Sequence, residues 1–302
     1  MAPPNAISVL GSFEQGQLNH WYVSQSSTLA SVAGESAGDD AGMDSANLLG
    51  LAKPITKSVA GQYDTASAYA GVLPTKRSVA AFTSTGQSFS DMHALGFAMA
   101  GVSYFTIMDQ PGTVTMTLHL SGTLSSLTLG SKAAMSLVAI GSGVDEGLLN
   151  TLDQGSQGDD LDVLQAMQAL PQINDRHAQV VSARHADGAG GTDTFDQDLA
   201  VSADGVAFAC PESGAGQAYC GKYLYGFTLG LQAASTNNAH ADFAHTLTVT
   251  GLQLPQGAAL SFEPGAAIPT TTAVPEASTG AMTLVGLGMV AGCLARRRRQ
   301  QH

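Results

Sequence analysis

Residues 113–122 read TVTMTLHLSG, and this stretch decides the fold. Val114, Met116, Leu118 and Leu120 alternate with threonine and histidine. Successive side chains of a β-strand point to opposite faces, so the alternation predicts a strand with one buried face and one solvated face. Half-buried strands of this kind are typical of antiparallel sheets.

Two later segments repeat the pattern. Residues 222–232, KYLYGFTLGLQ, place aromatic residues and leucines on one face and mainly glycine and threonine on the other. In residues 240–255, HADFAHTLTVTGLQLP, Phe243, Leu247 and Val249 alternate with threonines. Turn signals separate these runs, and together they predict a mainly β fold, a β-sandwich or jelly-roll-like domain.

Composition divides the chain into four parts. Residues 1–100 are rich in serine, alanine and glycine with weak periodicity, and we expect them to belong to the β-domain. Residues 101–265 carry the predicted core of the sandwich. Residues 266–274 are rich in proline and threonine, which indicates an extended tether, and residues 275–302 form a distinct tail.

One segment has helical rather than strand periodicity. Residues 159–172, DDLDVLQAMQALPQ, begin with aspartates, which suit the positive end of a helix dipole. The apolar residues fall near one helical stripe: Leu161, Leu164, Met167 and Leu170. The pattern predicts a short surface helix inserted between strands and ending before Pro171.

The charge distribution narrows the range of functions. Charged residues make up only 12% of the chain and the net charge is −12, although four of the twelve basic residues are clustered at 296–299. The rest of the chain is therefore strongly acidic and repels phosphate backbones, which argues against nucleic-acid binding. The low charge and abundant glycine favour an exported β-rich protein.

The tail predicts a membrane-spanning helix. Residues 277–295 carry no charge, and as a helix they would span roughly 28 Å, close to the hydrocarbon thickness of a bilayer. Four arginines follow directly: Arg296, Arg297, Arg298 and Arg299. Arginines beside an apolar helix stay on the cytoplasmic side, which places the acidic body outside.

The tail also resembles a known sorting signal. A short motif precedes the apolar stretch and the arginines: Val274, Pro275, Glu276, Ala277, Ser278 and Thr279. Motif, apolar helix and arginine cluster together resemble the PEP-CTERM signal of Gram-negative bacteria, with Ala277 where that family usually has a second proline. The resemblance implies an inner-membrane-anchored precursor, recognition by an exosortase-type enzyme, and delivery to the cell surface or to an exopolysaccharide and biofilm matrix.

Export also requires a leader sequence. Residues 1–17 have no basic region and no apolar run of useful length, so they do not form a signal peptide. We expect a leader upstream of Met1 or one already removed, and the alternative is that the protein is not exported.

The cysteines offer a possible disulfide. Cys210 and Cys220 bound the loop CPESGAGQAYC, in which proline and glycines allow the chain to fold back. Closing it would contribute roughly 3 kcal/mol in the chain-entropy model, and it requires an oxidising compartment. Two free thiols are the alternative.

A serine motif raises the possibility of hydrolysis. Residues 34–38, GESAG, fit the G-x-S-x-G nucleophile elbow, with Ser36 as the nucleophile. That elbow needs a buried strand before it and a helix after it, and the alternative is a flexible loop.

An acidic segment raises the possibility of calcium binding. Residues 187–198, DGAGGTDTFDQD, present four carboxylates on a glycine-rich loop: Asp187, Asp193, Asp196 and Asp198. Hard oxygen ligands at this density suit calcium, although the spacing is not that of an EF-hand, and a solvated acidic turn is the alternative.

Taken together, the sequence predicts a non-enzymatic exported surface or matrix protein without a resident cofactor. A carbohydrate-binding module on the same scaffold is the first alternative, but it needs exposed aromatic residues, and the chain has one tryptophan, Trp21. A secreted serine hydrolase is the second.

Overall fold

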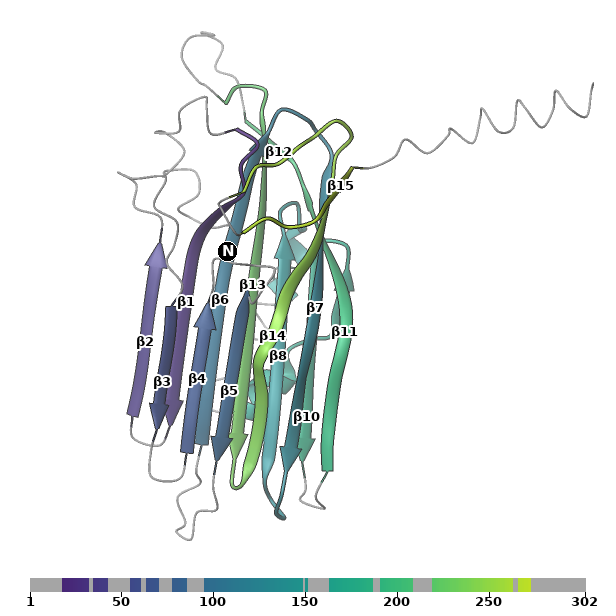
Figure 1. Ribbon diagram of the computed structural model, residues 1–302. Helices are drawn as coiled ribbons and strands as arrows, with labels where there is room; N and C mark the ends of the chain where they lie inside the picture. The colour runs from purple at the N-terminus through teal and green to yellow at the C-terminus, as the bar shows by residue number, and fades with distance from the viewer. Residues whose placement is uncertain are drawn as a thin grey trace, which may run out of the picture.

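The protein is a sandwich of two β-sheets (Figure 1). The computed structural model describes residues 18–32, 35–42, 55–60, 64–70, 78–85, 95–148, 150–151, 163–186, 191–208, 219–262 and 266–272. The two sheets confirm the prediction of a mainly β sandwich.

The first sheet has eight strands in the order β2-β1-β6-β13-β8-β10-β9, with β12 paired to β13. Its strands are β1 (Tyr22–Val32), β2 (Glu35–Gly42), β6 (Leu95–Met108), β8 (Lys132–Gly141), β9 (Ile173–Asp175), β10 (Ala178–Ala186), β12 (Val206–Ala207) and β13 (Tyr223–Thr236). All of these pairs are antiparallel.

The second sheet has seven strands in the order β11-β7-β14-β5-β4-β3, with β15 paired to β14. Its strands are β3 (Ile55–Ala60), β4 (Asp64–Ala70), β5 (Val79–Thr85), β7 (Thr113–Ser126), β11 (Gly191–Asp204), β14 (Ala239–Leu254) and β15 (Thr270–Thr272). The β14–β15 pair is parallel and the others are antiparallel.

The alternation in the sequence sets the core. The apolar residues of the quoted stretch, from Val114 to Leu120, are fully buried between the sheets, as are Leu229 of β13 and Phe243 of β14. Strand β14 contains a register shift between Val249 and Gly251, which turns Leu252 and Leu254 inward after it.

Several consecutive strands lie in opposite sheets, which closes the sandwich. Strands β6 and β7 are joined through residues 109–112, and β7 and β8 through residues 127–131. Strands β13 and β14 are joined by Asn237 and Asn238, with φ of 51° and 66°. Asparagine tolerates this left-handed conformation better than most residues, so the reversal fits in two positions.

The two ends of the described chain meet at one end of the sandwich. The amide of Trp21 donates to the Ser261 carbonyl at 3.0 Å, and the Ser261 amide donates to the Asn19 carbonyl at 2.7 Å. His20 and Ser261 form a parallel bridge. The first and last parts of the domain are thus joined by backbone hydrogen bonds.

The inserted helix is present as α3 (Val163–Ala169), which ends before Pro171 as predicted. Leu164 and Met167 are buried against Ala134 and Ala234 on the outer face of the first sheet. The preceding aspartates and Leu161 lie outside the described residues.

The segment after β14 differs from the expected tether. Ala266 and Ile268 are only 7% and 4% exposed, and Ile268 belongs to the main core. Residues 270–272 form β15. Proline and threonine content predicted an extended chain here, but it does not show whether such a chain is free or packed on a neighbouring strand.

Candidate functional site

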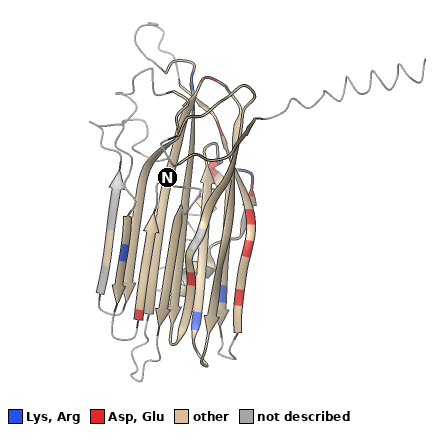
Figure 2. Ribbon diagram, viewed as in Figure 1, with Lys and Arg blue, Asp and Glu red and all other residues tan. Residues whose placement is uncertain are grey.

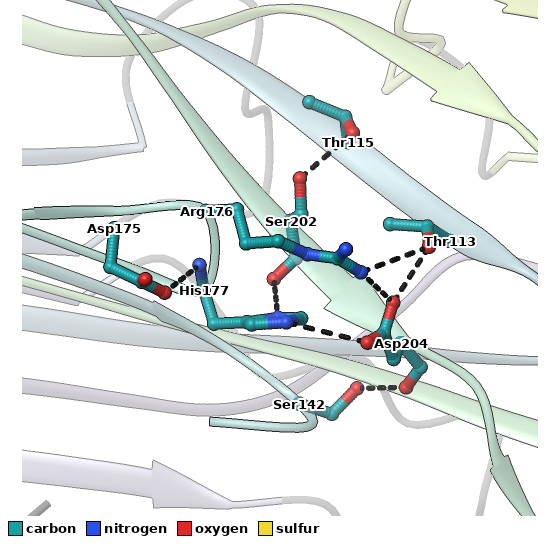
Figure 3. Close-up of polar contacts among 8 residues, drawn as sticks. All are labelled: Thr113, Thr115, Ser142, Asp175, Arg176, His177, Ser202 and Asp204. Atoms are coloured by element: carbon teal, nitrogen blue, oxygen red, sulfur yellow. Dashed lines mark hydrogen bonds and ion pairs between the residues drawn. The ribbon is translucent and has the colours of Figure 1, made fainter. Parts of the chain in front are cut away.

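A cluster of polar side chains joins the two sheets at one end of the sandwich (Figure 3). The carboxylate of Asp204, at the end of β11, lies at its centre. Arg176 Nη2 donates to Asp204 Oδ1 at 2.6 Å, and Thr113 Oγ1 donates to the same oxygen at 2.6 Å. His177 Nε2 lies 3.3 Å from Oδ2.

A tight hairpin presents the two basic residues. Arg176 and His177 form the turn between β9 and β10, and the His177 amide donates to Asp175 Oδ1 at 2.9 Å. An aspartate that accepts from the amide two residues later is a common device for stabilising a turn. Because the Ser202 amide also donates to the Arg176 carbonyl at 2.5 Å, the turn is held against β11.

The surroundings of Asp204 favour its charged form. Partial burial raises the pKa of the carboxyl, but the hydrogen bonds from Thr113 and Arg176 and the electrostatic influence of Arg176 and His177 outweigh this effect. The pKa of Asp204 therefore lies below its ordinary value.

The cluster is arranged for structure rather than for proton transfer. His177 Nδ1 lies 3.1 Å from the Ser202 carbonyl oxygen, so both ring nitrogens face acceptors. The Ser142 hydroxyl donates to the Asp204 carbonyl at 2.8 Å, and the Ser202 hydroxyl pairs with Thr115 at 2.9 Å. A general base needs a free nitrogen next to a nucleophile, and these residues do not provide that pair. The sequence patterns did not indicate this cluster, although an aspartate two residues before the histidine is a turn signal.

A groove crosses the outer face of the first sheet. Ser27, Gly101, Gly230 and Val138 lie side by side on β1, β6, β13 and β8 and line its centre. Met99, Ser136 and Gln232 line one side. The groove has a volume of about 120 Å³, and the side chains that line it carry no charge. It exists because two neighbouring strands place glycine at the same level.

Two clusters cover the outer face elsewhere. Helix α3 and Phe97 cover the rows next to Ala134 and Ala234. Towards the other end, Tyr22 stacks on Phe105 with ring centroids 5.1 Å apart. Phe208 and Tyr219 belong to the same aromatic cluster. The groove lies between the two clusters, because Gly101 of β6 falls between Phe97 of the first cluster and Phe105 of the second.

The predicted calcium ligands do not converge where they are described. Residues 191–204 form strand β11 rather than a loop. Acidic residues are spaced along the length of this strand (Figure 2). Asp198 and Asp196 lie 2.9 and 3.6 Å from His119, whereas Asp193 bonds His185 at 2.7 Å. Asp187 lies outside the described residues. Within the part of the chain that the structure describes, no three acidic, histidine or cysteine side chains are grouped for a metal ion.

The GESAG motif lies on an edge strand. Ser36 is the second residue of β2 and pairs with Ser31 of β1. The strand continues to Gly42, so the strand-to-helix turn of a nucleophile elbow does not follow the serine. Gly34 lies outside the described residues. The backbone after Ser36 therefore differs from that of a serine-hydrolase nucleophile elbow.

The described residues include only one of the two cysteines in the predicted disulfide. Cys220 is disulfide-bonded. Cys210 and Cys293 lie outside the described residues, so the pairing of Cys210 with Cys220 stays a prediction.

The residues singled out in the tail, 274–279 and 296–299, also lie outside the described part. Among the residues that are described, no helix is long and apolar enough to cross a membrane. The expected transmembrane helix would lie in the tail and stays a prediction.

Solved structures give only distant matches. TmCBM61 in complex with β-1,4-galactotriose is 6% identical, with a TM-score of 0.21 over 65% of this chain and 88% of that one. The family 11 carbohydrate-binding module from Clostridium thermocellum, in complex with a β-1,3-1,4-mixed-linked tetrasaccharide, is 10% identical, with a TM-score of 0.14 over 65% and 91%. The enzymatically active domain of tailspike protein 4 from bacteriophage CBA120 is 10% identical, with a TM-score of 0.14 over 63% and 19%. These scores are too low to support an argument about fold or ligand.

Sequence comparison identifies the tail. No curated protein matches the chain. The family model of the PEP-CTERM protein-sorting motif matches residues 273–299, which contain both the VPEAST motif and the four arginines. The match assigns no family to the sandwich. The chain therefore carries a PEP-CTERM sorting signal, which implies an exported protein that is processed by an exosortase.

Proposed function

We propose that this chain is a non-enzymatic protein of the cell surface or of an exopolysaccharide and biofilm matrix. One observation carries the proposal: the sorting signal at 273–299 follows directly on a β-sandwich whose last described strand is Thr270–Thr272. The sandwich is the cargo, and the tail holds the precursor in the inner membrane until the exosortase acts.

The chemistry of the described body fits a structural cargo. Its polar cluster fastens the two sheets together and leaves neither His177 nitrogen free for catalysis. Its outer edge strand β11 carries exposed aspartates, which discourage other strands from pairing with it.

The proposal is tested by replacing all four arginines, Arg296 to Arg299, with glutamine in cells that carry the sorting enzyme. The wild-type precursor should fractionate with the inner membrane and then reach the surface or matrix in shortened form. The variant should lose its fixed orientation, because the positive charges retain the tail on the cytoplasmic side. The amount of shortened protein should therefore be lower for the variant than for wild type.

The control replaces two lysines of the body, Lys57 and Lys132, with glutamine, which should leave sorting unchanged. Full-length wild-type protein found free in the cytosol, with the four-arginine variant distributed identically, would contradict the proposal.

A second candidate function is binding of a neutral carbohydrate in the groove of the first sheet. Hydroxyl and amide groups of Ser27, Ser136 and Gln232 alternate there with glycine and apolar surface, and this combination suits an uncharged polyhydroxyl chain. The volume of about 120 Å³ is below the roughly 300–1,000 Å³ typical of small-molecule pockets, so the groove would hold only part of a glycan. Trp21 offers no platform, because it is 3% exposed and stacks on Tyr104 inside the core.

A matched pair of variants tests this candidate. Gly230→Val places two methyl groups in the groove, and its Cβ has room because an added Cβ there meets no atom within 4 Å. Gly226→Val adds the same side chain four residues earlier in β13 on the same face, where the atom nearest to an added Cβ is 3.8 Å away. In a screen of neutral polysaccharides, Gly230→Val should abolish binding and Gly226→Val should retain it. Equal binding by both variants, or no binding by wild type, rules the groove out.

A further inference from the structure

The last described segment, residues 266–272, is fastened along β14. Within β15, Thr270 pairs with Leu252 and Thr272 pairs with Leu254. The Leu252 amide donates to the Pro269 carbonyl at 2.9 Å. Ile268, 4% exposed, anchors the segment in the main core. We call residues 266–272 the strap.

The strap ends immediately before the sorting motif. Ala273 alone separates Thr272 from Val274, the first residue of VPE. At about 3.3 Å per extended residue, the motif begins within about 7 Å of the last residue paired to the sandwich. An enzyme that encloses the motif needs accessible chain on both sides of it, because processing occurs preferentially at exposed, unpaired segments. The docked strap leaves almost no such chain on the N-terminal side.

The strap can open without unfolding the domain. Three residues of β15 are paired, and the side chains of all three are exposed. The opposite side of β14 stays paired to β7, with Leu252 opposite Met116 and Gln253 opposite Thr115. Ala266 and Ile268 are the buried side chains of the strap, so opening it also withdraws these two side chains from the core. A segment held by so few buried side chains opens locally at a fraction of the cost of global unfolding. Release of the strap would expose one side of β14 at its end and leave the rest of the sheet intact.

We propose that the strap is a release device: it must detach from β14 before the sorting enzyme can process the motif, so its docking sets the rate of processing. This inference rests on the proposed function, because it requires that the enzyme acts on residues 273–299. The observed rate then scales with the fraction of molecules in which the strap is open.

A disulfide lock tests the inference in the full-length protein. Gln253 and Thr271 are paired in register, and both are exposed, so Gln253→Cys with Thr271→Cys should form a bond across β14 and β15. In cells that carry the sorting enzyme, the oxidised double variant should be processed at least about tenfold more slowly than wild type, because its open fraction is nearly zero. Addition of a reductant should restore the wild-type rate. Each single cysteine variant serves as a control and should be processed normally.

Two further variants separate the strap from other effects. Ile268→Ala removes most of the buried anchor and should make processing several-fold faster than wild type. A ten-residue Gly/Ser insertion after Thr272 in the locked protein provides accessible chain beyond the strap, and it should restore processing without reductant.

The outcomes distinguish the inference from the proposed function. If wild type is never shortened in these cells, the proposed function fails. If wild type is shortened and the oxidised lock is shortened at the same rate, the strap inference fails while the proposed function stands. A locked protein that stays unprocessed even with the insertion also overturns the strap inference, because accessible chain was then not limiting.

Discussion

Replacement of Gly141 by alanine is expected to destabilise the protein by about 3 kcal/mol, at the upper end of the usual overpacking cost. Gly141 ends β8, and its amide donates to the His177 carbonyl at 2.8 Å. An added Cβ would overlap the Ser202 carbonyl oxygen and lie 2.6 Å from its carbon. Backbone cannot rotate away as a side chain can, so β8 and β11 would have to separate at the end where the polar cluster joins them.

Urea unfolding of purified wild type and variant measures this effect. Gly230→Ala is the matched control, because the same substitution in the neighbouring strand β13 meets no atom within 4 Å. It should be neutral or slightly stabilising, since alanine loses less backbone entropy than glycine. Equal midpoints for Gly141→Ala and wild type would show that the two sheets are not in close contact at this end.

Asp204→Asn should cost about 1–2 kcal/mol at pH 6 and progressively less as the pH is lowered below about 4. The substitution keeps the shape of the side chain but removes the negative charge that Arg176 and His177 face. We take the low end of the range for buried charged hydrogen bonds because the Asp204 side chain is 40% exposed.

The direction of the pH effect follows from the pKa of Asp204, which is lower in the folded protein than its ordinary value of 3.8. A depressed carboxyl pKa stabilises the fold above the unfolded-state value, and this contribution is lost as the pH falls through the folded-state value. The stability difference between wild type and Asp204→Asn should therefore be constant from pH 6 to 5 and shrink towards pH 3.

Asp198→Asn provides the comparison, because Asp198 pairs with His119 on the open face of β7 and is 72% exposed. An exposed pair contributes little, so this variant should lie within about 1 kcal/mol of wild type. An Asp204→Asn protein as stable as wild type at pH 6, or a difference undiminished at pH 2.5, would contradict the role given to Asp204.

The parts of the fold that the sequence predicts are those in which one face of a strand is apolar. Strand β7 is the clearest case, because every second residue from Val114 to Leu120 is buried. Strand β1 shows why the N-terminal part was harder to interpret. Its inward face includes Ser26 and Thr28, which are 1% and 3% exposed, so burial there is not accompanied by hydrophobicity.

Strand β11 shows a second limit. Its outward positions carry Asp196 and Asp198, and glycines precede them at 188, 190 and 191. This composition predicted an acidic loop, either a calcium site or a solvated turn. The strand forms because it pairs with β7 and because its inward residues, among them Val201 beside Met116, complete the core at this edge of the sheet. The cluster around Asp204 was equally hidden, because it assembles from residues far apart in sequence, and only the pairing of the strands brings them together.

The backbone hydrogen bonds between Asn19, Trp21 and Ser261 bear on when this domain can fold during its synthesis and passage across a membrane. A chain that is made and threaded from its N-terminus cannot seal this junction until nearly all of the cargo has emerged. The N-terminal and C-terminal parts of the sandwich are therefore joined only once residue 261 is available, twelve residues before the matched sorting signal begins at residue 273.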